Sequence, residues 1–142
     1  MSQRLYFEDV EVGDEIPPLT KEPTRELVSH FVRMMGWDFG LFTDDEQARQ
    51  MGQEKAIAPG ELTLGFLAQM LTDWAFGATL QHLEANYRGV VRHGDRIACG
   101  GIVTEKHWKE EGGTIECDVF IQNQEGDRPV VGKARLRLPS RA

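Results

Sequence analysis

The sequence predicts an α+β domain in which a long antiparallel sheet is wrapped around one central helix. The stretch 62–74 is apolar on nearly every side, which is typical of a buried helix. From about residue 80 onward, strand-like segments alternate with turns that contain glycine. A single buried helix in a chain of 142 residues needs another layer to cover it. The strands supply that layer, and the whole chain, 1–142, is expected to form one domain.

The part of the chain before the central helix is predicted to hold one strand and one helix. The segment Leu5–Ile16 is expected to be extended and to close at Pro17-Pro18. A helix is expected from Thr24 to Met35, because apolar residues recur at helical spacing and Thr24 can cap the first turn. Gly36 should end this helix, a loop follows, and residues 46–51 add a further turn or two.

The second half of the chain is predicted to form the sheet. Strands are expected at 83–90, 96–105, 114–123 and 129–138, separated by turns at 93–95, 111–113 and 125–127. In the last strand, alternation predicts one apolar face, formed by Val131, Ala134, Leu136 and Leu138.

Composition argues against several classes of protein. The net charge of −7 provides no basic field for nucleic acid, and no apolar run is long enough to span a membrane. The two cysteines, Cys99 and Cys117, lack CxxC spacing, and no signal peptide is evident, so a cytoplasmic location is expected. No metal and no cofactor are expected, because metal-ligand clusters, P-loop and dinucleotide fingerprints are missing from the sequence.

Four segments together resemble the MaoC-like domain family. They are YFEDVEVGDE near the start, the loop WDFGLFTDD, the stretch IAPGELTLGFLAQMLTDW and the stretch NYRGVVRHGDRIACGGIVTEK, so the resemblance covers about Leu5 to Lys106. The family has the hot-dog fold and includes (R)-specific enoyl-CoA hydratases and 3-hydroxyacyl thioester dehydratases. The resemblance implies that two such folds pair, as a homodimer or with a related subunit. It also implies a CoA or carrier-protein acyl thioester bound between them.

The resemblance further implies an Asp and a His, five positions apart on the loop after the first helix, that handle water and a substrate proton. Matching the Trp-Asp-Phe variant of this loop places Asp38 at the Asp position and Thr43 at the His position. Counting without gaps instead places Trp37 and Phe42 there. The first register is preferred because it keeps a carboxylate. Neither supplies the histidine, and a threonine cannot exchange protons near neutral pH unaided, so activity is in doubt.

The start of the central helix offers the other candidate site residues. The resemblance implies that the backbone N–H of Gly60 polarises the thioester carbonyl, as a helix N-terminus can. Gly60 could equally serve only to open the helix after Pro59. Glu61 suggests a thioesterase carboxylate, or simply a carboxylate stabilised by the helix dipole. The residues expected to contact substrate are Pro59, Glu61 and Arg88. Arg88 and Arg92 could contact the CoA phosphates, or both could be ordinary exposed arginines.

The remaining candidates are assigned structural roles. His93 is expected in a turn, and Asp44, Asp45 and Glu46 in a solvated acidic turn. The aromatic residues are expected to lie mostly in the core, with one or two lining an acyl pocket: Phe39, Phe42, Phe66, Trp74 and Phe76. Three functions stay open: a hydratase/dehydratase with an incomplete dyad, a non-catalytic partner of an active subunit, and a thioesterase that uses Glu61 or Asp38.

Overall fold

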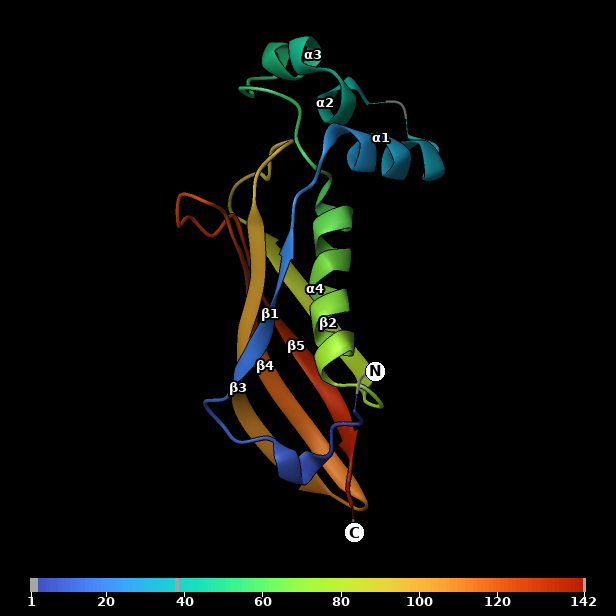
Figure 1. Cartoon of the computed structure of the whole chain (residues 1–142), viewed down its shortest axis with the longest axis vertical. Helices are drawn as coiled ribbons and strands as arrows, with labels where there is room; N and C mark the ends of the chain where they lie inside the picture. Colours follow the sequence, from blue (N-terminus) through green and yellow to red (C-terminus); the bar gives the residue numbers. More distant parts are fainter. Residues whose placement is uncertain (1–2, 38, 142) are drawn as a thin grey trace.

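The structure is a computed structural model that describes residues 3–37 and 39–141. Its sheet has five antiparallel strands in the order β1-β3-β4-β5-β2. The strands are β1 (Glu15–Lys21), β2 (Thr79–Tyr87), β3 (Ile97–Lys109), β4 (Gly112–Gln122) and β5 (Val130–Pro139). The sheet packs against one long helix, as Figure 1 shows, so the predicted α+β class is confirmed.

The central helix, α4 (Gly60–Trp74), lies along one face of the sheet (Figure 1). It begins directly after Pro59, where the sequence predicted its start. Its buried side chains are Leu62, Thr63, Phe66, Leu67, Met70 and Leu71. They form the core together with inward-facing residues of the strands, and removing this apolar surface from water is the main driving force for the fold.

Three shorter helices gather at the end of the molecule where α4 begins: α1 (Arg25–Met34), α2 (Gly40–Thr43) and α3 (Asp45–Gln50) (Figure 1). Thr24 caps α1 as predicted, because its hydroxyl accepts a hydrogen bond from the N–H of Leu27 at 3.2 Å. Gly36 follows α1 with a φ of 73°, a value that favours glycine. The helix α2 falls in the segment predicted to be a loop, where Gly40 and a run of only four residues gave no helical pattern.

The N-terminal segment closes the opposite end of the molecule. It contains a 3-10 turn, η1 (Phe7–Asp9), where the sequence predicted an extended segment. The Phe7 ring packs on Trp108 of β3, with ring centroids 5.6 Å apart. The prediction that the strand closes at Pro17-Pro18 is also wrong, because β1 runs through both prolines. An edge strand tolerates proline, and a shift in register between Ile16 and Leu19 accommodates the pair.

Two details of the β-hairpins also differ from the sequence prediction. Gly112 and Gly113 belong to β4, so the turn lies at residues 110–111, where Glu111 has a φ of 65°. In β5 the buried face includes Val130 rather than Val131. Val131 has the same parity as Lys133 and therefore points to the other face of the sheet.

Within the described residues, no helix has both the length and the apolar character that crossing a membrane requires. Cys99 and Cys117 are buried free thiols on β3 and β4. Burial raises the pKa of each thiol to about 12, so both stay protonated and unreactive at neutral pH.

Candidate active site

An apolar cavity of about 300 Å³ lies between α2 and the N-terminus of α4. Its lining residues are Trp37, Phe39, Leu41, Phe42, Met51 and Glu61. Phe39 and Met51 are more than half exposed, at 56% and 59%, so the mouth of the cavity is open. Among the described residues of this lining, Glu61 is the one that carries a charge. An apolar recess with a charged group at its edge suits a ligand with an apolar chain and a reactive head.

The first turn of α4 carries two backbone N–H groups without helical acceptors. The N–H groups of Leu62 and Thr63 donate to the carbonyl of Pro59 at 3.1 and 3.3 Å. Those of Gly60 and Glu61 come earlier in the turn and have no carbonyl one turn back to receive them. The helix dipole adds partial positive charge at this point. The edge of the cavity at Glu61 is therefore suited to an oxygen that carries negative charge.

Tyr87, at the end of β2, packs against the start of α4. Its hydroxyl donates to the carbonyl of Gly60 at 3.0 Å, and the hydroxyl of Thr63 donates to the same oxygen at 2.9 Å. A Cβ at position 60 would lie 2.9 Å from two atoms of the Tyr87 ring, so any larger residue would force the ring or the helix start to shift. Burial raises the pKa of Tyr87, and the charge of Glu61 raises it further, so the phenol stays protonated. Sequence reasoning missed Tyr87, because a contact across 27 residues leaves no local pattern.

The loop expected to hold a catalytic pair is built around α2. Asp38 lies outside the described residues. The Thr43 hydroxyl donates to the carbonyl of Phe39 at 3.4 Å, one turn back along α2. The Thr43 carbonyl accepts a hydrogen bond from Arg25 of α1 at 3.0 Å. Thr43 is not among the residues that line the cavity, whereas Phe42 is.

The acidic residues after α2 hold the short helices in place. Asp44 caps α3 by accepting the N–H of Glu46 at 2.9 Å. Asp45 accepts the N–H of Ala56 and a hydrogen bond from Arg25, each at 2.9 Å. The bond from Ala56, more than the charge of Arg25, lowers the pKa of Asp45. Across the described parts of the chain, no three His, Cys, Asp or Glu side chains gather in a way that could hold a metal ion.

His93 contacts α2 through a hydrogen bond. It lies in the turn before β3, as the sequence predicted, and it is only 6% exposed. Its Nε2 lies 2.7 Å from the carbonyl of Phe42. Burial lowers the pKa of His93, so the neutral ring donates through Nε2 and leaves Nδ1 bare, with no partner among the described residues. The other three histidines lie exposed on α1, β2 and β3: His30, His82 and His107.

A second cavity of about 270 Å³ gathers three arginines near the same end of the molecule. Arg88 and Arg92, which the sequence indicated, line it together with Arg128, which the sequence did not. The segment 88–92 runs beside the residues that lead into α4, because the N–H of Ala58 donates to the carbonyl of Val91 at 2.7 Å. The backbone that carries these arginines is therefore hydrogen-bonded to the backbone that leads into α4.

Four of the five aromatic residues singled out in the sequence lie in the core, against it or at the apolar cavity, and Phe76 is the exception. Phe66 is buried in the core, Trp74 is half-buried and Phe76 is 50% exposed. Phe39 and Phe42 line the apolar cavity, and their rings meet edge to face with centroids 6.0 Å apart.

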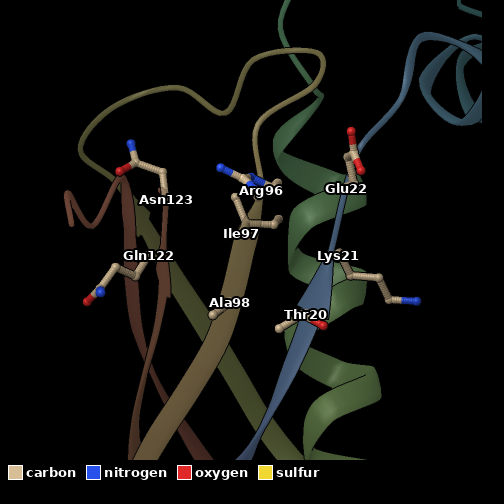
Figure 2. Close-up of a pocket in the computed structure, with 8 residues that line it drawn as sticks. All are labelled: Thr20, Lys21, Glu22, Arg96, Ile97, Ala98, Gln122 and Asn123. Atoms are coloured by element: carbon tan, nitrogen blue, oxygen red, sulfur yellow. The ribbon is translucent and has the colours of Figure 1, made fainter. Parts of the chain in front are cut away.

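A larger cavity of about 410 Å³ lies at the ends of β1, β3 and β4, and Figure 2 shows its lining. The side chains of Lys21 and Glu22 point away from those of Gln122 and Asn123. Its polar groups do not converge on one point, so this cavity offers no arrangement for chemistry.

No family model and no curated protein matches the sequence. Solved structures do match. One is an (R)-hydratase from A. caviae, with 22% identity, coverage of 93% of this chain and 99% of that chain, and a TM-score of 0.84. A MaoC-like dehydratase from Rhodospirillum rubrum has 18% identity, covers 97% and 99%, and has a TM-score of 0.85. The ChsH1-ChsH2 complex from Mycobacterium tuberculosis matches with 18% identity, 90% and 98% coverage, and a TM-score of 0.79.

The chain has the MaoC-like hot-dog fold. The match spans nearly the full length of both chains, so the β-rich C-terminal part, where the sequence offered only a strand pattern, belongs to the same fold. This confirms the fold that the resemblance implied. The MaoC-like fold does not by itself assign roles to side chains, because one fold supports many sites.

Proposed function

We propose that the chain is a MaoC-like hydratase/dehydratase that acts on an acyl thioester. The observation that carries this proposal is the apolar cavity that ends at the N-terminus of α4, with the N–H of Gly60 at the start of the helix. The cavity supplies an apolar environment for an acyl chain. The helix start supplies hydrogen-bond donors and positive potential for the thioester oxygen.

In this proposal the thioester carbonyl oxygen accepts the N–H of Gly60. When water adds, its oxygen bonds to Cβ of the enoyl thioester, one water proton goes to a base, and negative charge moves to the carbonyl oxygen. Protonation of Cα then completes the syn addition, and dehydration is the reverse. Asp38 is the proposed base and Thr43 the proposed group that holds the water. Pro59 and Glu61 border the thioester.

The proposed site lacks the histidine of the family's catalytic pair, so the chain is expected to be slow by itself or to work with a partner. We propose pairing with a second copy or with a related hot-dog subunit. The similarity to a complex of two proteins, ChsH1 and ChsH2, supports the second arrangement. We also propose a cytoplasmic location, which is consistent with the two buried free thiols.

A thioesterase is the second candidate, and the position of Glu61 favours it. This carboxylate lines the apolar cavity in the first turn of α4, beside the N–H groups that would hold the carbonyl oxygen. A carboxylate in that place is positioned to activate water for attack on the thioester carbon, which would release the thiol and a free acid.

The test is mass spectrometry of enoyl-CoA and acyl-CoA panels incubated with the purified protein. Hydration gives a product heavier by one water, and we expect Asp38→Asn to lower its rate by about 10²-fold or more, the usual contribution of a general base. Glu61→Gln should leave this rate largely intact. Release of free CoA that Glu61→Gln abolishes would instead establish the thioesterase. If neither product forms, the chain alone is not the enzyme, and co-purification of a partner subunit becomes the deciding observation.

A further inference from the structure

Among its described lining residues, the apolar cavity at the start of α4 has three aromatic rings and one carboxylate. The rings are those of Trp37, Phe39 and Phe42, and the carboxylate is that of Glu61. Aromatic rings attract cations through their faces, and proteins bind quaternary ammonium groups in this way. We propose that the cavity binds a quaternary ammonium group carried by the acyl chain of the ligand. The thioester part of this inference rests on the proposed function, whereas the cation site is tested without it.

The three rings form adjoining walls rather than one flat stack. The ring centroids of Trp37 and Phe42 lie 6.1 Å apart, with the ring planes at 40°. Those of Phe39 and Phe42 lie 6.0 Å apart, with the planes at 86°. The face of an aromatic ring carries partial negative charge, so a cation in the corner between two such rings is attracted by more than one of them. A rounded group such as trimethylammonium fits a corner of this shape.

The aromatic walls are held in position before any ligand arrives. The Phe31 ring of α1 packs edge to face on Trp37, with ring centroids 5.7 Å apart. The ring of His93 holds the carbonyl of Phe42 by the hydrogen bond of 2.7 Å described above. Walls that are already fixed lose little conformational freedom when a ligand binds, so more of the contact energy appears as affinity.

Glu61 supplies a negative charge that the described chain does not neutralise. Other carboxylates at this end of the molecule pair with arginines: Asp45 with Arg25, Glu46 with Arg49 and Glu54 with Arg92. By contrast, none of the described basic side chains lies within ion-pair distance of the Glu61 carboxylate. Glu61 is exposed, so a ligand that enters through the open mouth of the cavity meets this carboxylate directly.

A quaternary ammonium group suits this lining better than a neutral chain or a primary amine does. A neutral acyl chain would contact the rings but would displace water from Glu61 without replacing it, which is unfavourable for a charged group. A primary amine carries three N–H donors that need acceptors, and the aromatic rings provide none. The methyl groups of a quaternary ammonium bury apolar surface against the rings and Leu41, while its charge lies near Glu61.

The start of α4 can hold a thioester oxygen and a cation at separate points. Its first N–H groups and the helix dipole present a positive charge of about half an elementary charge. The Glu61 side chain carries a full negative charge into the cavity, so the field beside that carboxylate favours a cation. The net charge of −7 on the whole chain also raises the local concentration of cations.

The first test compares choline with 3,3-dimethylbutan-1-ol, which has the same shape but a carbon atom in place of the charged nitrogen. Each is titrated into the full-length protein at constant ionic strength and followed by the NMR signals of its methyl groups. We expect choline to bind about fivefold tighter or more, because only choline gains the cation–π contacts. Phe42→Leu keeps an apolar wall and should weaken choline about threefold or more, with less than about twofold effect on the alcohol. Glu61→Gln should act in the same direction by about the same factor.

Two matched variants serve as controls. Phe76→Leu changes a ring that is 50% exposed and does not line the cavity. Glu26→Gln removes the same charge from the first turn of α1. Neither should change the affinity for choline by more than about twofold. Phe39→Leu, at a position that is 56% exposed, keeps the test decisive if Phe42→Leu does not fold. Equal affinities for choline and the alcohol, or no binding of either, would overturn the proposal.

A kinetic comparison separates this proposal from the proposed function. It uses two enoyl-CoA substrates, one whose acyl chain ends in trimethylammonium and one that ends in the neutral tert-butyl group. We expect the KM of the charged substrate to be lower by about fivefold or more, and Glu61→Gln to remove most of this difference. If both thioesters react equally well and choline shows no preference over the alcohol, the function stands and the cation site fails. If choline binds selectively and neither thioester reacts, the cation site stands and the proposed function fails.

Discussion

The two ends of α4 are built differently. At its C-terminal end, the N-terminal segment and the tail of the chain seal the core, and Leu138 of β5 is fully buried there. At its N-terminal end, Phe39 and Met51 remain more than half exposed around a cavity, and the first N–H groups of the helix lack helical partners. Apolar packing is therefore complete at the C-terminal end of α4, whereas apolar side chains and backbone N–H groups stay without partners in the helix at its N-terminal end.

This contrast indicates how the molecule divides stability from ligand binding. At the closed end, the Glu8 carboxylate accepts hydrogen bonds from the hydroxyl of Ser140 and from the backbone N–H of Arg141. At the open end, apolar side chains and backbone N–H groups are exposed where a ligand could contact them. Substitutions at the two ends should therefore affect different measurements.

The largest expected effect comes from shortening a buried side chain at the closed end. Leu138→Ala should lower the free energy of unfolding by about 2–5 kcal/mol, because it leaves a cavity in a packed core. Phe39→Ala at the open end should cost less than about 1 kcal/mol, since the ring is mostly in water already, but should raise KM for acyl thioesters. Denaturant unfolding of both variants checks this pair. Similar losses of stability would remove the distinction between the ends.

A smaller effect is expected at the start of α4. Gly60→Ala places a Cβ 2.9 Å from the Tyr87 ring, so the ring or the helix start must shift, at about 1–3 kcal/mol. A shift of about 1 Å at this position would also lower activity about 10²-fold. The matched control is Gly65→Ala in the same helix, where a Cβ meets nothing within 4 Å. That change should stabilise the protein by about 0.5–1 kcal/mol. Thermal unfolding and the thioester assay together test both variants.

The smallest expected effect is a difference in pH response. Burial holds the pKa of His93 below its ordinary value of 6.5, so the unfolded chain binds the proton more tightly than the folded protein. The contribution of His93 to the free energy of unfolding is therefore fully present above about pH 6.5. It is lost as the pH falls below that value toward the lowered pKa. The fall in thermal midpoint between pH 7.5 and 5.5 should be smaller in His93→Gln than in the wild type. The same fall in both proteins would contradict this.

The closed end should respond in a more acidic range. The hydrogen bond from Ser140, followed by that from the backbone of Arg141, lowers the pKa of Glu8 from 4.5. The folded protein therefore favours the ionised form, and this stability is present above about pH 4.5 and lost as the pH falls through the lowered pKa. Glu8→Gln should change the midpoint at neutral pH but flatten only the part of the profile below about pH 4.5. His30→Gln, at an exposed position, is the control for both ranges.

The framework of the molecule was predictable because local patterns determined it. Pro59 followed by an apolar run predicted α4, and Thr24 and Gly36 marked the two ends of α1. The fold itself followed from the order of four segments rather than from any single motif. The error at Val131 arose where Gly132 interrupts the alternation and hides which valine shares a face with Ala134.

The site was less predictable, because its contacts join distant segments. The hydrogen bond from Tyr87 to Gly60 and the place of Arg128 beside Arg88 both depend on how strands pair. His93 shows the same limit: the sequence predicted its turn, but only the fold brings its ring to the carbonyl of Phe42. The roles of Asp38 and Thr43 stay predictions.

The prolines of β1 also restrict how the sheet can be extended. Pro17 and Pro18 have no N–H to donate, so β1 is a poor template for another strand at its outer edge. The opposite edge, β2, contains no proline, so each N–H along its nine residues that points away from β5 is able to donate to a further strand. A sheet with one blocked edge and one open edge can grow in one direction only. If two copies join their sheets, they must therefore meet through β2, which ends at Tyr87 beside the start of α4.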